Sequence, residues 1–270
     1  PAARPVLEAG AKDLGVPVTA VAQAPAGESL KLKPVRVGLY DQYGGSMTSG
    51  WTRWLLEQFE FPFEVVYPGI LDAGNLAGRF DVLVFTDGAA RVAKAADARG
   101  PDPQTIPEQY RGWLGRISED RTMPEIRKFV ENGGALVAIG SSTGMAQLLG
   151  LPVKSYLVEM TAEGRERALP REKYYVPGSL LRMTLDGNHP LAYGMPGEVQ
   201  VFFNNSPVFR LEPDAPLKRT APVGWFSGPE VLTSGWAWGQ QYLDGGTAVV
   251  EAALGRGKVL LFGPEIASRA

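Results

Sequence analysis

Two short apolar segments, residues 81–85 and 135–140, constrain the fold of this chain more than any other feature. Each is a continuous run, mainly of Val, Leu, Ile and Ala, and each is followed by a polar turn. Such runs are typical of strands that are buried on both faces. Helix-like segments at 50–59 and 122–131 separate the predicted strands. This alternation predicts an α/β fold, a flavodoxin-like three-layer sandwich with a mostly parallel sheet.

The main domain is predicted to span residues 34–270. Within it, residues 91–121 are rich in Pro, Gly and charged residues, and they are predicted to form an insertion between a strand and a helix. The second half of the domain is more strand-like than the first. Strands are predicted at 35–40, 63–67, 180–185, 199–203, 208–211, 248–252 and 258–262.

Residues 1–33 are predicted to form a leading βα fragment and a linker. Apolar residues spaced along 4–14 predict a short helix that ends at Gly15. The β-branched residues at 16–21 predict a strand, and a polar linker with Pro and Gly follows it. The chain does not begin with Met, and we expect it to be a segment of a longer protein.

The composition excludes several kinds of chemistry. There is no cysteine and only one histidine, His189, so a cysteine nucleophile and a disulfide are excluded, and no metal site is predicted. The net charge is −2 and the pI about 5.7, which does not favour a nucleic-acid or anionic-membrane partner. No apolar run reaches 18 residues, so no transmembrane helix is expected.

The strand and turn around residue 140 have the sequence shape of a nucleophile elbow. Ser141 and Ser142 occupy the turn, where a serine nucleophile could be activated by His189, with Asp186 or Glu265 orienting the imidazole. The alternative is that these serines cap the following helix, as serine often does. The flanking pattern of an elbow is only partly kept, which favours the capping role.

Polar residues also follow the first and third predicted strands. Asp41, Tyr43 and Ser46 come after the first strand, and Asp87 comes after the third. Ligands of open α/β sheets bind at the carboxyl ends of the strands, so these side chains could line one cleft with Ser141. The alternative is that Asp41 and Asp87 only end strands and cap turns.

Two segments carry paired tryptophans. Trp51 and Trp54 are spaced i, i+3 on a predicted helix, and Trp236 and Trp238 alternate in a glycine-bordered segment. Exposed aromatic rings near a cleft could stack on a sugar or a peptide. Their spacing favours packing in the core or against another domain.

Residues 136–142 and 260–265 resemble two segments of class I glutamine amidotransferases. The first resembles the elbow that carries the catalytic cysteine, and the second the terminal Phe-His-Pro-Glu. The resemblance places the cysteine position on Ser141 or Ser142, the histidine position on Gly263 and the glutamate position on Glu265. It therefore implies the class I glutamine amidotransferase-like fold in a degenerate form, without the cysteine and the histidine of the reaction.

A longer resemblance covers nearly the whole chain. Segments at 45–57, 169–179, 189–195 and 234–239 are similar to the amidotransferase-like tail domain of large bacterial secreted zinc carboxypeptidases. The resemblance implies a non-catalytic accessory domain for binding or interdomain packing, next to an N-terminal peptidase domain that would hold the zinc. It also implies a peptide or cell-wall-like ligand, no cofactor in this stretch, and a secreted or periplasmic location. A serine hydrolase and a small-ligand sensor are the alternatives.

Overall fold

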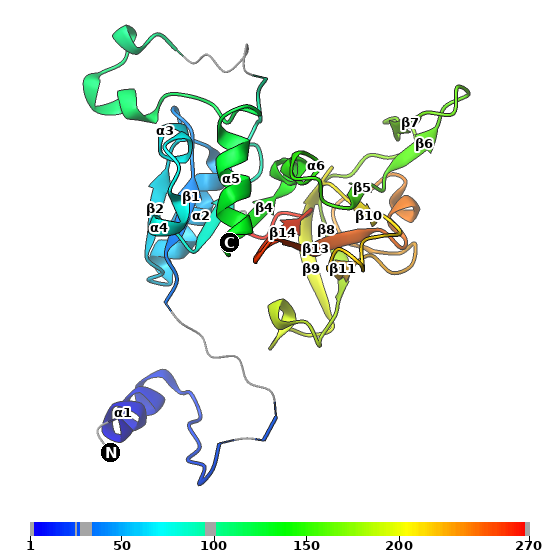
Figure 1. Ribbon diagram of the computed structural model, residues 1–270. Coiled ribbons are helices and arrows are strands. Elements are labelled where there is room, and N and C mark those ends of the chain that lie inside the picture. The colour runs from blue at the N-terminus through cyan, green and yellow to red at the C-terminus, as the bar shows by residue number, and fades with distance from the viewer. Residues whose placement is uncertain (1–2, 25, 28–33, 95–100, 268–270) are drawn as a thin grey trace. The chain divides into compact units, whose positions relative to one another are not determined.

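The computed structural model describes residues 3–24, 26–27, 34–94 and 101–267 and divides the chain into two units, Pro1–Pro34 and Val35–Ala270 (Figure 1). In the first unit, helix α1 spans Arg4–Leu14 and ends at Gly15 in the left-handed region (φ 66°), as predicted. The predicted strand at 16–21 is wrong. Those residues are exposed and pair with no strand in their unit, and Pro17 lacks the N–H that a ladder requires.

The second unit contains five parallel strands that run side by side. In spatial order they are β2, β1, β3, β4 and β14. This is the 2-1-3-4-5 order of flavodoxin-like sheets, and it confirms the predicted α/β fold class. The strands span Phe63–Val66, Val37–Tyr40, Val82–Phe85, Ala135–Ile139 and Gly257–Phe262.

Helices cover both faces of these strands. The connection from β1 to β2 runs toward the edge of the sheet, whereas the connections from β2 to β3 and from β3 to β4 run in the opposite direction. Because such crossovers are right-handed, α2 lies on one face of the sheet and the later helices lie on the other. The helices are α2 (Met47–Gln58), α3 (Pro68–Asp72), α4 (Leu76–Arg79), α5 (Thr122–Glu131) and α6 (Met145–Leu148). Short 3₁₀ turns span Pro103–Thr105, Glu108–Trp113, Gly140–Gly144, Pro190–Ala192 and Gln240–Leu243.

Beyond β14 the sheet becomes antiparallel, so the sheet as a whole is mixed. The hairpin that joins β13 to β14 has the turn that the glycines at 255 and 257 predict. Strands β13, β11 and β8 continue the sheet, with β9, β12, β10 and β5 paired along them, and β6 and β7 form a separate ribbon. Their bounds are Thr247–Leu254, Thr220–Trp225, Pro177–Leu185, Glu198–Asn204, Leu232–Ser234, Phe209–Leu211, Val153–Ser155, Val158–Met160 and Glu166–Ala168.

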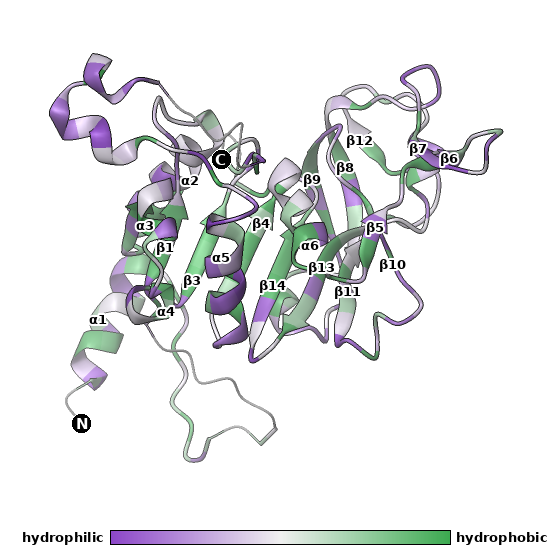
Figure 2. Ribbon diagram, turned by 45° about the horizontal axis from the view of Figure 1, so that its top comes forward, coloured by the Kyte–Doolittle hydropathy of each residue, from purple (hydrophilic) through white to green (hydrophobic). Residues whose placement is uncertain are grey.

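Each half of the sheet has its own hydrophobic core. The first core fills the space between the parallel strands and helices α3 to α6, and it includes Phe85, Ile126 and Leu136. The second core lies within the antiparallel strands around Phe203 and Phe226, whose rings meet edge to face at 5.6 Å. Figure 2 shows β3 and β4 as largely hydrophobic, whereas hydrophobic and hydrophilic residues mix along the strands of the antiparallel half.

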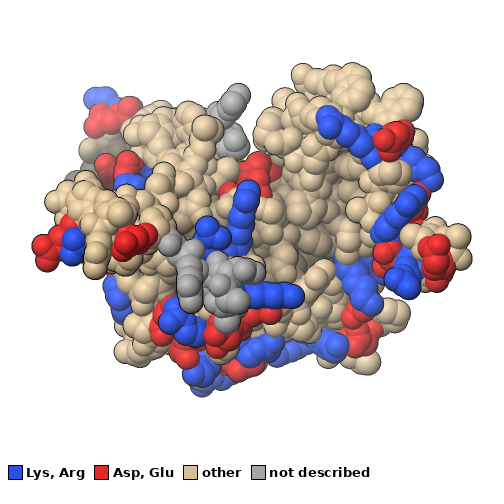
Figure 3. All heavy atoms as spheres, turned by 90° about the horizontal axis from the view of Figure 1, so that it is seen from above, with Lys and Arg blue, Asp and Glu red and all other residues tan. Residues whose placement is uncertain are grey.

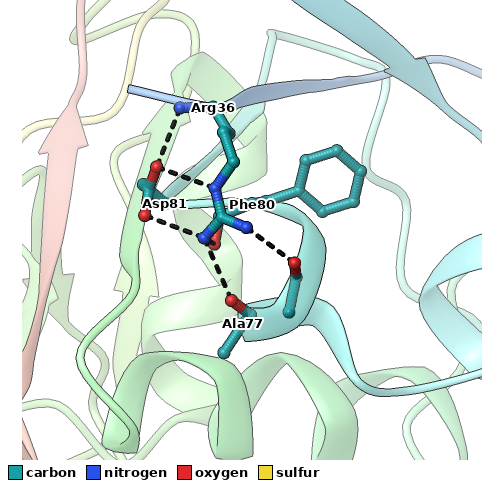
Figure 4. A network of polar contacts seen from close by, with 5 residues as sticks. Arg36, Ala77, Phe80 and Asp81 are labelled. Atoms are coloured by element: carbon teal, nitrogen blue, oxygen red, sulfur yellow. Dashed lines mark hydrogen bonds and ion pairs between the residues drawn. The ribbon is translucent and has the colours of Figure 1, made fainter. Parts of the chain in front are cut away.

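A single arginine ties the amino ends of β1 and β3 together. The guanidinium of Arg36 contacts both carboxylate oxygens of Asp81, at 3.0 Å each, and donates to the carbonyls of Ala77 and Gly78 at the end of α4 (Figure 4). The backbone N–H of Arg36 donates to the same carboxylate. These contacts fix α4 and two central strands in one register, although their exposure limits their contribution to stability.

We expect Phe203→Ala to lower the free energy of unfolding by about 3–5 kcal/mol, because it removes a fully buried ring from the second core. Phe59→Ala is the control, because that ring is largely exposed and its loss should change stability by less than about 0.5 kcal/mol. Urea unfolding followed by circular dichroism measures both. Equal stability of the two variants would contradict the assignment of Phe203 to a core.

Candidate functional site

The carboxyl ends of the parallel strands bring four of the predicted residues to one edge of the sheet. Asp41 follows β1, Asp87 follows β3, Ser141 follows β4 and Glu265 follows β14. Because parallel strands end at the same edge, residues far apart in the sequence meet there. The sequence therefore located the edge correctly, and the contacts between these residues decide what the edge can do.

Asp87 and Ser141 form a closed hydrogen-bonded unit. The hydroxyl of Ser141 donates to Oδ1 of Asp87 at 2.6 Å, and the N–H of Ser141 donates to the same oxygen at 2.7 Å. The N–H of Gly88 donates to Oγ of Ser141 at 2.9 Å. The N–H of Gly88, of the kind that stabilises an oxyanion in hydrolases, is thus bound to the serine itself, and the carboxylate of Asp87 holds the turn that carries Ser141.

Ser142 has a structural role in the loop after β3. Its side chain is fully buried, its hydroxyl donates to the carbonyl of Thr86 at 2.5 Å, and it accepts from the N–H of Ala90 at 3.3 Å. The alternative prediction was that Ser141 and Ser142 cap the following helix. Neither hydroxyl does so. Both hydroxyls instead join the turn after β4 to the loop after β3.

The strained residue of the turn is Gly140, which precedes both serines. Gly140 has φ of +57°, and a nucleophile elbow places its reactive side chain on such a sharp strand-to-helix turn. A Cβ atom at Gly140 would lie 2.5 Å from Cγ of Asp87. Ser141 and Ser142 lie in the turn Gly140–Gly144, as predicted, but the residue with positive φ is Gly140. The elbow position has no side chain, and Asp87 fills the space that one would need.

His189 lies far from this edge. Its Nδ1 accepts from the N–H of Leu191 at 3.3 Å, and its Nε2 is 3.6 Å from Oε2 of Glu251. Through β14, Glu251 is aligned with Val137, four residues before Ser141, a separation of about 13 Å along the strands. The predicted pairing of His189 with a serine is not formed, because the turn that carries His189 packs beside the middle of β13.

Asp41 and Ser46 hold the loop after β1. Asp41 is buried, which raises the pKa of its carboxyl, and its Oδ1 accepts from the N–H of Gln42. Ser46 caps α2 by accepting from the N–H of Ser49, so the helix begins at Met47, earlier than the predicted segment 50–59. Tyr43 lies half-buried in the same loop. These residues build the wall of the edge through local bonds.

A polar pocket opens beside this loop, between the ends of β1 and β3. Its volume is about 360 Å³. The order of the strands reverses between β1 and β3, which is where open α/β sheets bind ligands. Two arginines of the predicted insertion, Arg91 and Arg116, reach into it. The lining residues are Tyr40, Gln42, Gly88, Ala89, Arg91 and Arg116.

Glu265 differs from the other carboxylates of the edge. Burial, and then the negative charge of Asp87, raises the pKa of Glu265 to about 7. Its Oε1 is buried and has no hydrogen-bond partner among the residues that the structure describes. Glu265 is therefore a carboxyl that holds its proton near neutral pH, with an unused acceptor.

The tryptophans lie partly on the surface. Trp51 and Trp54 meet edge to face at 6.1 Å on α2, and Trp54 is exposed. Trp236 and Trp238 are also exposed, and Nε1 of Trp238 donates to the carbonyl of Glu172 at 2.7 Å. Three of these four rings therefore lie outside the two cores of this chain, and packing against another domain stays a prediction.

Charges and metal-ligating groups are dispersed. On the face seen in Figure 3, Lys and Arg are intermixed with Asp and Glu, so neither sign dominates it. In the described ranges, no three His, Cys, Asp or Glu side chains come together in a group that could hold a metal ion. Within the same ranges, no helix has the length and apolar character needed to span a membrane.

Comparison with known proteins finds similarity in structure only. No family model matches the sequence, and no curated protein is similar to it. A putative ThuA-like protein from Bacteroides uniformis is 10% identical, with a TM-score of 0.46 over 90% of this chain and 86% of that one. A putative GMP synthase protein from Thermoplasma acidophilum is 11% identical, with a TM-score of 0.46 over 87% and 85%.

A β-galactosidase from Bacillus circulans is also similar in structure. It is 9% identical, with a TM-score of 0.47, over 85% of this chain. This chain spans only 28% of the β-galactosidase. At identities this low, the similarity concerns the arrangement of the chain and not its chemistry.

We expect Gly263→Ala to destabilise the fold by at least about 2 kcal/mol. A Cβ atom there would lie 1.9 Å from the carbonyl oxygen of Pro207, which is backbone and cannot turn away. Gly144→Ala is the matched control, because nothing lies within 4 Å of its added Cβ. Thermal unfolding measures both. A Gly263→Ala protein as stable as the control would show that this position, where the resemblance places a histidine, accepts a side chain.

We expect the Glu265 carboxyl to make the fold less stable as the pH rises from about 4.5 to about 7. The folded chain keeps this proton at pH values where the unfolded chain has lost it, so stability falls across that window and then levels off. Relative to Glu265→Gln, the loss should be on the order of 1 kcal/mol, since the side chain is partly exposed and screened. Urea unfolding between pH 4 and 8 measures it, with exposed Glu57→Gln as the control.

Proposed function

We propose that this chain is a non-catalytic accessory domain that binds a ligand at the carboxyl edge of its parallel sheet. The observation that carries the proposal is the elbow, where Gly140 offers no side chain and the carboxylate of Asp87 fills the space beside it. The hydroxyl of Ser141 is bonded to that carboxylate, and His189 lies beside Glu251. This edge is where open α/β sheets bind their ligands, but here no serine hydroxyl is in contact with the histidine.

The polar pocket between β1 and β3 is the place where we propose that the ligand binds. Arg91 and Arg116 supply fixed positive charge, and the loop that contains Gly88 and Ala89 forms part of the wall. Guanidinium groups form paired, charge-assisted hydrogen bonds with carboxylates. The chemistry of this pocket therefore suits an anionic group, and we propose that it takes the free carboxylate at the end of a peptide.

The parent protein is proposed from the resemblance described above. A tail domain of a secreted zinc metallocarboxypeptidase-like protein would meet peptides with free carboxyl ends, and it would lie next to its own N-terminal peptidase domain. The zinc would belong to that domain, and the location would be secreted or periplasmic. The alternative, a serine hydrolase that uses Ser141 or Ser142 with His189, requires contacts that differ from those of the two hydroxyls.

We expect Arg91→Ala and Arg116→Ala each to weaken binding of an alanine hexapeptide with a free carboxylate by about tenfold or more. Each substitution removes a charge-assisted hydrogen bond, for which such a loss is typical. Isothermal titration calorimetry measures the affinity. The same peptide with an amidated end should bind weakly to the unaltered protein and to both variants.

Arg165→Ala is the control for the loss of one positive charge. Arg165 is exposed in the turn between β6 and β7, away from the pocket. The Arg165→Ala substitution should leave the affinity for the free-carboxylate peptide unchanged. If the free and amidated peptides bind equally well, or if all three arginine variants behave alike, the pocket does not recognise a carboxylate.

A further inference from the structure

The antiparallel half of the sheet closes on itself. Strands β9, β8, β11, β13 and β14 are neighbours in that order. Immediately after β14, the N–H of Glu265 donates to the carbonyl of Phe202 in β9 at 3.1 Å, and the two residues form an antiparallel bridge. The last strand thus returns to the first. A ring of strands closed in this way has an interior, as small β-barrels do.

These strands line a cavity of about 310 Å³. Several of the lining side chains also belong to the core that contains Phe203, and the exposed Leu191, Met195 and Ile266 line its opening. The mouths of β-barrels are common places for small-molecule sites, which are mainly apolar with few polar groups. All five strands contribute apolar side chains to its wall, among them Met183, Leu185, Val201, Val223, Val249 and Phe262.

Among the described residues that line the cavity, Glu265 is the one with a carboxyl group. Its Oε1 is buried and accepts no hydrogen bond from the residues that the structure describes. The nearby negative charge of Asp87 acts on the same carboxyl. A buried acceptor without a partner is costly, and two neighbouring carboxyls favour a cation between or beside them. The cavity therefore combines an apolar wall with a single site for a cationic donor.

We infer that this cavity binds a small molecule with an apolar body and one ammonium group, a primary alkyl or arylalkyl amine, and that Glu265 anchors the ammonium. An engineered cavity of about 150 Å³ lined by apolar side chains binds benzene. The volume here is about twice as large, which suits a chain of eight carbons or a fused ring pair. The ligand would place its apolar part on Met183 and Val249.

This inference is independent of the peptide site proposed above. The peptide pocket lies between β1 and β3 and recognises an anion through arginines, whereas the barrel cavity recognises a cation through a carboxyl. The two pockets have no lining residue in common. Arg91→Ala should therefore leave amine binding unchanged, and failure of one proposal leaves the other standing.

The test compares n-octylamine with n-octanol and n-octanoate at pH 8, where the carboxyl and the ammonium are both charged. Binding to the full chain is measured by isothermal titration calorimetry. We expect octylamine to bind at least tenfold more tightly than octanol, and octanoate to bind most weakly, because only the amine can donate charged hydrogen bonds to Glu265.

Two variants separate the carboxyl from the cavity. Glu265→Gln should weaken octylamine binding at least tenfold and leave octanol binding nearly unchanged, which also shows that the variant folds. Val199→Phe should weaken both ligands, because the larger ring fills the cavity that Val199 lines. Leu180→Phe, on an exposed position of β8, is the control and should weaken neither.

Three outcomes would overturn the inference. The first is that octylamine and octanol bind equally well. The second is that Glu265→Gln leaves octylamine binding unchanged. The third is that none of the three probes binds. Suppose that Val199→Phe weakens octanol binding while Glu265→Gln leaves the affinity for octylamine unchanged. In that case the cavity binds apolar molecules without regard to charge, and the assignment of an amine is wrong.

Discussion

The structure depends on the two-sided pairing of β14. This strand is parallel to β4 over residues 258–262 and antiparallel to β13 through a tight hairpin. A strand inside a sheet must satisfy hydrogen-bonding groups on both edges, and here each edge belongs to a different half of the fold. The helix-covered parallel half and the curled antiparallel half therefore meet in six residues, Gly257–Phe262. Without that strand, each half would present an open edge.

The same strand delivers Gly263 and Glu265 to the edge where Gly140 and Asp87 lie. A Cβ atom added at Gly263 would collide with the carbonyl of Pro207, and one added at Gly140 would collide with the carboxylate of Asp87. Neither position can accept a side chain without displacing its neighbours. A side chain at either position would therefore require the surrounding backbone or the Asp87 side chain to move.

Much of the parallel half could be predicted from the sequence, because a strand buried on both faces leaves an unmistakable run of apolar residues. Residues 81–85 and 135–140 are such runs, and both are strands. The antiparallel half was harder. Strand β11 contains Pro222 and Gly224, which are poor strand formers, and tertiary pairing overrides that preference. The segment at 16–21 shows the converse, since β-branched residues without a neighbouring strand remain unpaired.

The candidate site was predictable in position but not in contacts. That Asp41, Asp87, Ser141 and Glu265 share an edge follows from strand order alone. Which residue takes the strained backbone of the elbow depends on one residue of register, and the sequence does not fix it. Arg91 and Arg116 were missed because they belong to an irregular insertion. The one signal for them was that the insertion follows a strand beside the point where strand order reverses.

The place of β14 in the sequence has a consequence for how the protein is made. The strand that joins the halves is the last one along the chain in the part that the structure describes, although it lies near the middle of the sheet. A ribosome must complete more than 250 residues before this segment emerges. Until then, the growing chain holds β4 with one unpaired edge, a template for wrong pairing with other chains. The intermediate with this open edge therefore persists from the completion of β4 at Ile139 until β14 has been made, and a chaperone that shields strand edges would act in that interval.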